Sequence, residues 1–190
     1  MNNLLPNIMS KITTYHISSK LIHWIMAIII IPQLIIGLYM VQILASDAPF
    51  RSTIYSLHKS FGVLAIGLIF YRIINKIINR TPPLPNSLAR WQIICAKIVH
   101  YKLYLLMVLM PFSGYLMSNS YGYPVKFFGF TMPYLTQKNY QMASFYSNCH
   151  KYIGYLFFTL ITIHILAAMK HRFFDQKENN VLARISLFNK

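Results

Sequence analysis

Residues 149–169 read CHKYIGYLFFTLITIHILAAM, and this stretch decides the fold. It is apolar and long enough to cross a bilayer, whose hydrocarbon core of about 30 Å takes roughly 20 helical residues. It carries His150 and His164, which are nearly four helical turns apart. Both side chains therefore face the same way, separated by about 21 Å along the helix axis. The stretch predicts a membrane-spanning helix with one histidine toward each membrane face.

Three further apolar runs are long enough to span, at about residues 21–44, 57–78 and 100–118. Pro32 and Pro111 lie inside the first and third runs, where neighbouring helices make a kink tolerable. The first run lacks a small-residue cleavage site, so we expect an uncleaved span. Together the four runs predict an all-α, integral membrane four-helix bundle, with residues 1–190 forming a single membrane domain.

The composition supports a membrane protein and indicates its orientation. The chain is 56% hydrophobic and 11% charged, whereas soluble domains carry roughly 25% charged residues. Its net charge of +15 comes from 18 Lys and Arg against 3 acids, which we attribute to lipid headgroups and topology rather than to nucleic acid. With both termini cytoplasmic, thirteen of these basic residues lie inside and five lie outside, which is the favoured arrangement.

Two connecting segments have a character of their own. Residues 86–99 place apolar side chains at helical spacing and predict an interfacial helix that leads into the third span. Residues 119–148 are rich in Tyr and Phe. The rings fit either an aromatic belt at the outer interface or a lid over a cofactor or quinone.

The histidines are the candidate functional residues, because ionisable groups inside a span are costly. The spans contain almost no Asp or Glu, which argues against carboxylate proton relays and carboxylate-ligated metals. Imidazole in an apolar setting suits haem iron. Since a haem takes one axial ligand from each of two facing helices, the helix with His150 and His164 can serve two haems.

Local sequence selects the partners of these two histidines. His58-Lys-Ser-Phe-Gly62 and His150-Lys-Tyr-Ile-Gly154 share a glycine one turn after the histidine, where a side chain would obstruct a porphyrin. His23 and His164 have an alanine at the same spacing, whereas His16, His100 and His171 have larger residues there. Depth then pairs His58 with His150 at the outer side and His23 with His164 at the inner side.

Two further residues, Arg72 and His100, each allow two interpretations. Arg72 follows His58 on the same helix face and either pairs with haem propionates or anchors the span in the positive-inside sense. His100 opens the third span and contacts either a propionate or quinone, or only water.

Several motifs resemble the bacterial cytochrome b561 family, and the resemblance runs from about Tyr15 to Ile185. The matching motifs are Ile22-His-Trp24, His58-Lys-Ser-Phe-Gly62, Arg72, Thr81-Pro-Pro83, His100-x-x-x-Tyr-Leu-Leu106, Phe128-Gly-Phe-Thr-Met-Pro-Tyr134, His150 with Gly154-Tyr155, and His164. The resemblance implies two haem b groups ligated by His23, His58, His150 and His164, in the inner membrane of a bacterium. One member of that family oxidises superoxide and reduces ubiquinone.

We therefore expect an electron-transfer oxidoreductase that passes single electrons between an outer donor and ubiquinone. If superoxide is the donor, Lys59 and Lys151 beside the outer ligands would attract the anion. One alternative is a haem-carrying anchor that connects a soluble dehydrogenase to quinone, although the sequence requires no partner protein. The other is a transporter or structural bundle without haem.

Overall fold

The computed structural model describes residues 14–85 and 87–188. Four long helices form the molecule: α2 (Ile17–Gln42), α3 (Arg51–Ile78), α4 (Arg90–Ser120) and α5 (Tyr140–Phe173). Each is long and apolar enough to cross a membrane, which confirms the predicted all-α membrane bundle. Lys11, Lys190 and Asn86, which entered the charge count and the expected interfacial helix, lie outside the described residues.

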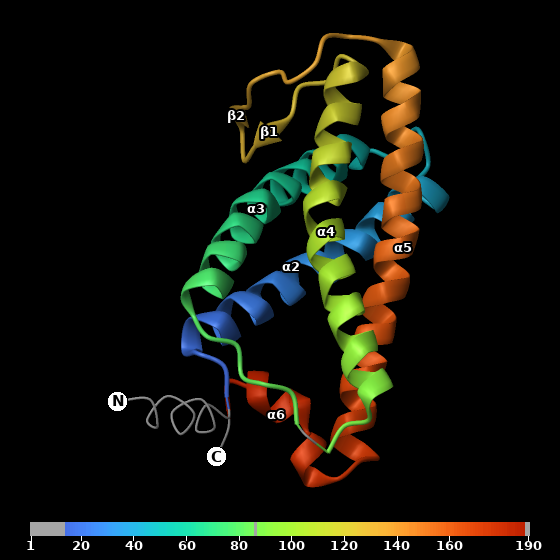
Figure 1. The fold of residues 1–190 in the computed structure, drawn as a ribbon. Helices are drawn as coiled ribbons and strands as arrows, with labels where there is room; N and C mark the ends of the chain where they lie inside the picture. Colours follow the sequence, from blue (N-terminus) through green and yellow to red (C-terminus); the bar gives the residue numbers. More distant parts are fainter. Residues whose placement is uncertain (1–13, 86, 189–190) are drawn as a thin grey trace.

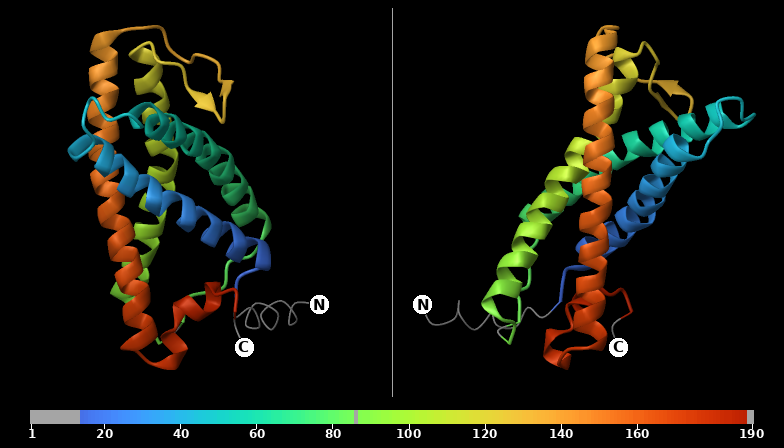
Figure 2. Two further views of the ribbon diagram at one scale, coloured as in Figure 1. Left: turned by 180° about the vertical axis from the view of Figure 1, so that it is seen from behind. Right: turned by 90° about the vertical axis from the view of Figure 1, so that its right-hand side faces the viewer.

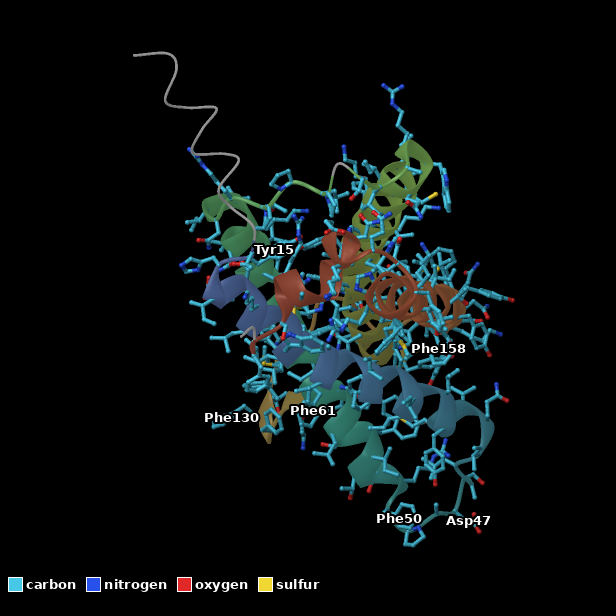
Figure 3. The ribbon with its side chains drawn as sticks, turned by 90° about the horizontal axis from the view of Figure 1, so that it is seen from below. Tyr15, Asp47, Phe50, Phe61, Phe130 and Phe158 are labelled. Atoms are coloured by element: carbon cyan, nitrogen blue, oxygen red, sulfur yellow. The ribbon has the colours of Figure 1, made fainter. Side chains whose placement is uncertain are left out.

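The helices turn large apolar side chains outward, as membrane-spanning helices do. Ile28 is 72% exposed and Ile77 is 79% exposed, although both lie in long helices. In Figure 3, which looks at the bundle from below, Phe50 and Phe130 lie at the edge of the molecule. Outward apolar groups of this kind are stable only in lipid, because water would make the exposed surface costly.

The helices pack as two pairs that splay apart, α2 with α3 and α4 with α5 (Figures 1 and 2). α3 also packs on α4, whereas α5 makes few close contacts with either α2 or α3. The buried core lies where the pairs meet and includes Met26, Ile69, Leu106 and Phe157. α5 therefore approaches the first pair less closely than it approaches α4.

The helices are longer than the apolar runs that predicted them, and side-chain caps fix two of the ends. The Asn139 side chain accepts a hydrogen bond from the Met142 N–H at the start of α5, and His16 accepts one from the Ser18 N–H at the start of α2. The helix expected over residues 86–99 as a lead into the third span begins at Arg90. It is continuous with that span and ends at Ser120, with Pro111 inside it.

The aromatic loop between α4 and α5 contains a short hairpin, β1 (Lys126–Phe127) and β2 (Phe130–Thr131), paired antiparallel. Gly129 in its turn has φ +101°, a backbone conformation that glycine adopts freely. The hairpin docks on α3 through Ser60, whose hydroxyl donates to the Lys126 carbonyl and accepts from the Phe128 N–H. It therefore covers the part of α3 that follows His58.

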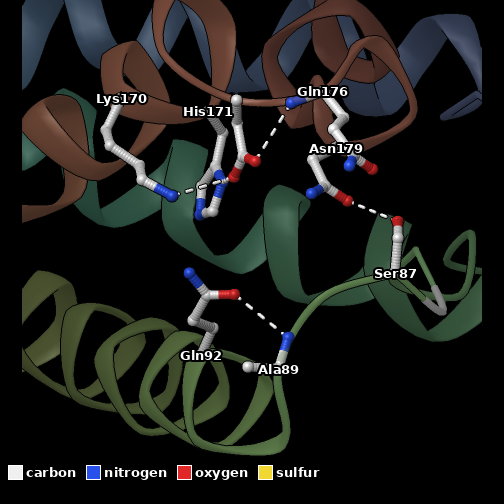
Figure 4. Close-up of polar contacts among 8 residues, drawn as sticks. Ser87, Ala89, Gln92, Lys170, His171, Gln176 and Asn179 are labelled. Carbon is white, nitrogen blue, oxygen red and sulfur yellow. Dashed lines mark hydrogen bonds and ion pairs between the residues drawn. The ribbon is translucent and has the colours of Figure 1, made fainter.

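We call the end of the bundle where α2 and α4 begin, and where α3 and α5 end, the lower end, as drawn in Figure 1. There the chain folds back through η1 (Lys177–Asn179) and α6 (Val181–Ile185). Trp24 Nε1 donates to the Ile185 carbonyl at 3.0 Å, and Ser87 Oγ donates to Asn179 (Figure 4). These contacts join the C-terminal segment to α2 and to the connection between α3 and α4.

Candidate functional site

Four histidines meet in two pairs at opposite ends of α5. The rings of His58 and His150 have centroids 6.4 Å apart, and those of His23 and His164 have centroids 6.3 Å apart. α2 and α3 each supply one histidine, and α5 supplies one to each pair. The pairing in space is the one predicted from depth.

The separation of the rings fits one metal atom between each pair. Metal–imidazole bonds are about 2 Å long, so two such bonds in line separate the two nitrogens by about 4 Å. The distance from each nitrogen to its own ring centroid accounts for the remainder of the centroid–centroid distance. Among residues 14–85 and 87–188, no group of three or more His, Cys, Asp or Glu side chains could hold a metal ion. The two-histidine arrangement fits axial ligation of a haem better than a metal held by protein side chains alone.

His150 is held against α4 by its Nδ1 atom. Nδ1 lies 3.1 Å from the Met110 carbonyl oxygen and 3.0 Å from Ser113 Oγ. A carbonyl can only accept, so Nδ1 carries the proton and donates it to Met110. Nε2 is then left with a free lone pair, which is the tautomer that metal-ligating histidines usually adopt.

Gly114 makes this close approach possible. A Cβ atom on Gly114 would lie 2.9 Å from His150 Cε1 and 3.2 Å from Nδ1. Neither Gly114 nor the Met110 carbonyl was predicted from the sequence. No spacing rule points to them, because their partner is on the next helix.

The space beside His58 is lined mainly by apolar side chains. A cavity of about 480 Å³, counted with its open side, lies between α2, α3, α4 and α5 and includes both His58 and His150 in its wall, together with Ile29, Ile30, Gln33, Leu34, Gly62, Ala65, Ile69, Met107, Met110, Pro111 and Phe157. A Cβ atom on Gly62 would meet nothing within 4 Å, and the buried His58 Nδ1 has no hydrogen-bond partner. A flat apolar group with a metal at its centre suits these walls. By contrast, a Cβ atom on Gly154 would lie 3.2 Å from the Met110 side chain.

The lower pair has a different surrounding, because cationic and aromatic groups contact it. Arg72 Nη2 lies 3.0 Å from His23 Nδ1, and Arg72 Nε donates to the Tyr104 hydroxyl at 3.3 Å. The His100 ring lies 5.2 Å from the His164 ring, centroid to centroid. The structure therefore brings both Arg72 and His100 to the lower pair.

The Arg72 contact has a consequence for the His23 tautomer. A guanidinium can only donate, so Nδ1 accepts and the His23 proton lies on Nε2. Metal binding through Nε2 needs the opposite tautomer, with the proton on Nδ1. If His23 bound a metal through Nε2, Arg72 would no longer donate to its Nδ1 atom, while its hydrogen bond to Tyr104 could remain.

The two lysines that follow the histidines of the upper pair differ in their exposure and their contacts. Lys59 Nζ donates to the Pro124 carbonyl at 3.4 Å and lies 5.6 Å from the centre of the Tyr123 ring, which ties it to the loop between α4 and α5. Lys151 is exposed and lies over the ring of Tyr152. Of these two lysines, Lys151 is the more exposed, so its charge is more accessible from solution.

Known proteins match most of the chain. Residues 14–184 match the model of the family described as prokaryotic cytochrome b561. "Cytochrome b561 homolog 2" of Escherichia coli K12 is 31% identical over 166 residues, which are 86% of this chain and 87% of that protein. "Probable superoxide oxidase CybB" of Yersinia pestis is 27% identical over 126 residues, 66% of this chain and 71% of that protein. "Cytochrome b561 homolog 1" of Escherichia coli K12 is 26% identical over 125 residues, 66% of this chain and 70% of that protein.

Proposed function

Since the chain belongs to the prokaryotic cytochrome b561 family, and is thus a bacterial membrane b-type cytochrome that transfers electrons, we propose that it holds two haem b groups and passes single electrons across the membrane to ubiquinone. The observation that carries the proposal is the pair of matched ring separations at opposite ends of α5. Family membership removes the alternative of a haem-free transporter or structural bundle.

The haems, when bound, supply the one-electron chemistry. His58 and His150 would hold the upper group, and His23 and His164 the lower one. Two protein ligands for each iron would favour electron transfer over oxygen binding. The Met110 carbonyl and Ser113 orient His150, and the apolar cavity wall keeps water away from the upper group.

We place the lower end in the cytoplasm, because thirteen of the eighteen Lys and Arg residues then lie inside. The upper end, with Lys59, Lys151 and the hairpin, then faces the outer side. We propose superoxide as the donor there, by analogy with the relative named as a probable superoxide oxidase. Superoxide loses one electron and leaves as dioxygen, and two electrons with two protons convert ubiquinone into ubiquinol.

The test is the haem content of purified protein and of single histidine variants. The wild type should carry two haems per chain with low-spin spectra. His58→Ala and His150→Ala should each lose the same haem, and His23→Ala and His164→Ala the other. His171→Gln is the control and should keep both, because His171 belongs to neither pair. A wild type with one haem, or a control that loses haem like the four variants, would overturn the assignment.

The donor and acceptor need a separate test. Purified protein in vesicles with ubiquinone should oxidise superoxide without any added protein. Activity only with a co-purifying dehydrogenase would replace this proposal by the anchor role, in which the protein connects that enzyme to quinone.

A further inference from the structure

A shallow recess opens at the lower end, between the end of α3 and the beginning of α4. Its walls are formed by Lys76, Lys97, His100, Tyr101 and Tyr104, and we call it the basic recess. Lys76 lies in the last turn of α3. Residues 97, 100, 101 and 104 follow the spacing that places side chains on one face of a helix. The recess is therefore a surface built by two helices and not by a flexible loop.

The basic recess carries positive charge that no protein carboxylate balances. Among the described residues, the two recorded ion pairs both involve Asp175, which binds Lys170 and His171. The whole chain has only 3 acidic residues. The positive charges of Lys76 and Lys97 are therefore not balanced by a protein carboxylate, which favours the binding of an anion in the recess.

Tyr104 holds one of these charges in place. The Lys76 ammonium lies 4.2 Å from the centre of the Tyr104 ring, within the range of a cation–π interaction. The Tyr104 hydroxyl accepts from Arg72 at 3.3 Å. The ring is therefore fixed from both sides, and the ammonium has a preferred position before any ligand arrives.

Exposed apolar residues adjoin both recess lysines in the sequence. Ile77 follows Lys76, and Ile98 follows Lys97, and both are exposed. Tyr101, itself a wall of the recess, is 72% exposed. A polar, cationic recess with apolar flanks at the end of membrane helices matches an amphiphile with an anionic head, since basic pockets between such helices bind acidic lipid headgroups.

We propose that the basic recess binds the phosphate of an anionic phospholipid, with its acyl chains along the exposed isoleucines. A neutral quinone ring would leave the two lysines unpaired, which makes it the poorer fit. The recess adjoins the lower pair, because the ring of its wall residue His100 lies 5.2 Å from the His164 ring and its wall residue Tyr104 accepts a hydrogen bond from Arg72 at 3.3 Å. This connection predicts a functional effect, and that part alone rests on the proposed haem at His23 and His164.

The first experiment measures lipid binding directly, by native mass spectrometry of delipidated protein titrated with phosphatidylglycerol or phosphatidylethanolamine. We expect one phosphatidylglycerol per chain to bind at least tenfold more tightly than phosphatidylethanolamine. Lys76→Gln with Lys97→Gln should abolish this preference, whereas Lys76→Arg with Lys97→Arg should keep it. The matched control is Arg90→Gln with Lys102→Gln, which removes two exposed charges from α4 outside the recess and should bind like the wild type.

Equal binding of phosphatidylglycerol by the Lys76→Gln, Lys97→Gln variant and by the control would overturn the proposal. So would displacement of the lipid by inorganic phosphate alone, or displacement by ubiquinone, because the recess would then be a phosphate or quinone site. These readouts need no haem, so they fail or succeed independently of the proposed electron transfer.

The second experiment is a redox titration in nanodiscs with and without phosphatidylglycerol. A bound anion near the lower pair stabilises the oxidised iron, so one of the two midpoint potentials should become more negative with the lipid. The Lys76→Gln, Lys97→Gln variant should lose this dependence, and the control should keep it. If the lipid binds but neither potential responds, the coupling between the basic recess and the lower pair is wrong.

Discussion

A Cβ atom on Gly114 would lie 2.9 Å from Cε1 of His150, closer than a real side chain allows. α4 and α5 therefore touch at this point with nothing between the helix backbone and the imidazole ring. The contact lets the ring donate to the Met110 carbonyl at 3.1 Å and turn Nε2 toward the cavity. The position of the upper ligand thus depends on a residue of another helix.

Gly114→Ala should therefore displace His150 and weaken the upper haem site. We expect haem content to fall from two toward one per chain, or the upper haem to become partly high-spin, because the added methyl group removes the space that the ring occupies. Pyridine haemochrome assay and optical spectra measure both outcomes. Gly67→Ala is the control, since a Cβ atom there meets nothing within 4 Å. Full retention of two low-spin haems in Gly114→Ala would contradict this account.

A substitution at Gly62 tests whether the cavity beside His58 holds a haem. Its Cβ position is open and lies in the wall shared with His58 and His150, so a large side chain would occupy the proposed haem space. Gly62→Leu should fold, because its Cβ atom meets nothing within 4 Å and the side chain starts from the cavity wall, yet it should lose about one haem per chain.

Gly67→Leu is the matched control on the same helix, because Gly67 is exposed and does not line the cavity. It should keep both haems. Two haems in Gly62→Leu would mean that the porphyrin does not lie against this glycine.

The histidine pairs could be predicted because their signal is local and periodic. His150 and His164 share a helix face by their spacing alone, and the small residue one turn on marks His58 and His23. The contact partners could not be predicted in the same way. Gly114 and the Met110 carbonyl meet His150 across an interface between two helices, and that interface depends on the packing of the whole bundle.

The continuous helix from Arg90 to Ser120 shows a second limit of sequence analysis. The apolar side chains at helical spacing in residues 86–99 predicted a helix at the membrane surface before the third span. Hydropathy reports where a helix leaves the lipid and not where its hydrogen bonds end, so the helix extends beyond the apolar run.

Arg72 should influence the potential of the lower haem. A cation near a haem favours the reduced iron, and an interaction of about 1–2 kcal/mol corresponds to roughly 40–90 mV for one electron. Arg72→Gln should lower one of the two midpoint potentials by about this amount. Arg72→Lys should shift it less, because the charge remains.

Redox titration of the Arg72 variants measures this shift. Arg90→Gln is the control, since it removes an exposed arginine at the start of α4, away from His23. Equal potentials for Arg72→Gln and the wild type would leave Arg72 as a structural contact between α3 and Tyr104 only.

Lys151 should contribute more than Lys59 to attraction of superoxide. Lys151 is exposed, whereas Lys59 donates to the Pro124 carbonyl. Lys151→Gln should lower the rate of superoxide oxidation several-fold at low salt and flatten its dependence on ionic strength, because steering by charge is screened by salt. Lys59→Gln should have the smaller effect. Pulse radiolysis or a stopped-flow assay over a range of salt concentrations measures both, and an unchanged salt dependence in the double variant would contradict the steering role.

The contacts of Asp175 at the lower end predict how the stability of the fold depends on pH. The Lys170 ammonium and then the His171 ring hydrogen-bond to its carboxyl group (Figure 4) and hold the Asp175 pKa well below its usual range. Because the pKa of Asp175 is lower in the folded chain than in the unfolded chain, the ionised carboxylate stabilises the fold. This stabilisation is complete above the ordinary carboxyl pKa of about 3.9 and is lost as the pH falls from there toward the folded-state pKa.

Asp175→Asn should therefore lower Tm by about 2 °C near pH 7. Below about pH 4 the difference from the wild type should shrink, because the Asp175 carboxyl group of the unfolded chain then takes up a proton while that of the folded chain is still ionised. Glu178→Gln is the control, since Glu178 is exposed and forms no ion pair recorded among the described residues. It should match the wild type from pH 8 to pH 3. Differential scanning fluorimetry in detergent over this range measures the difference. A difference that stays constant to pH 3 would show that Asp175 acts through hydrogen bonds that an asparagine cannot make, and not through its charge.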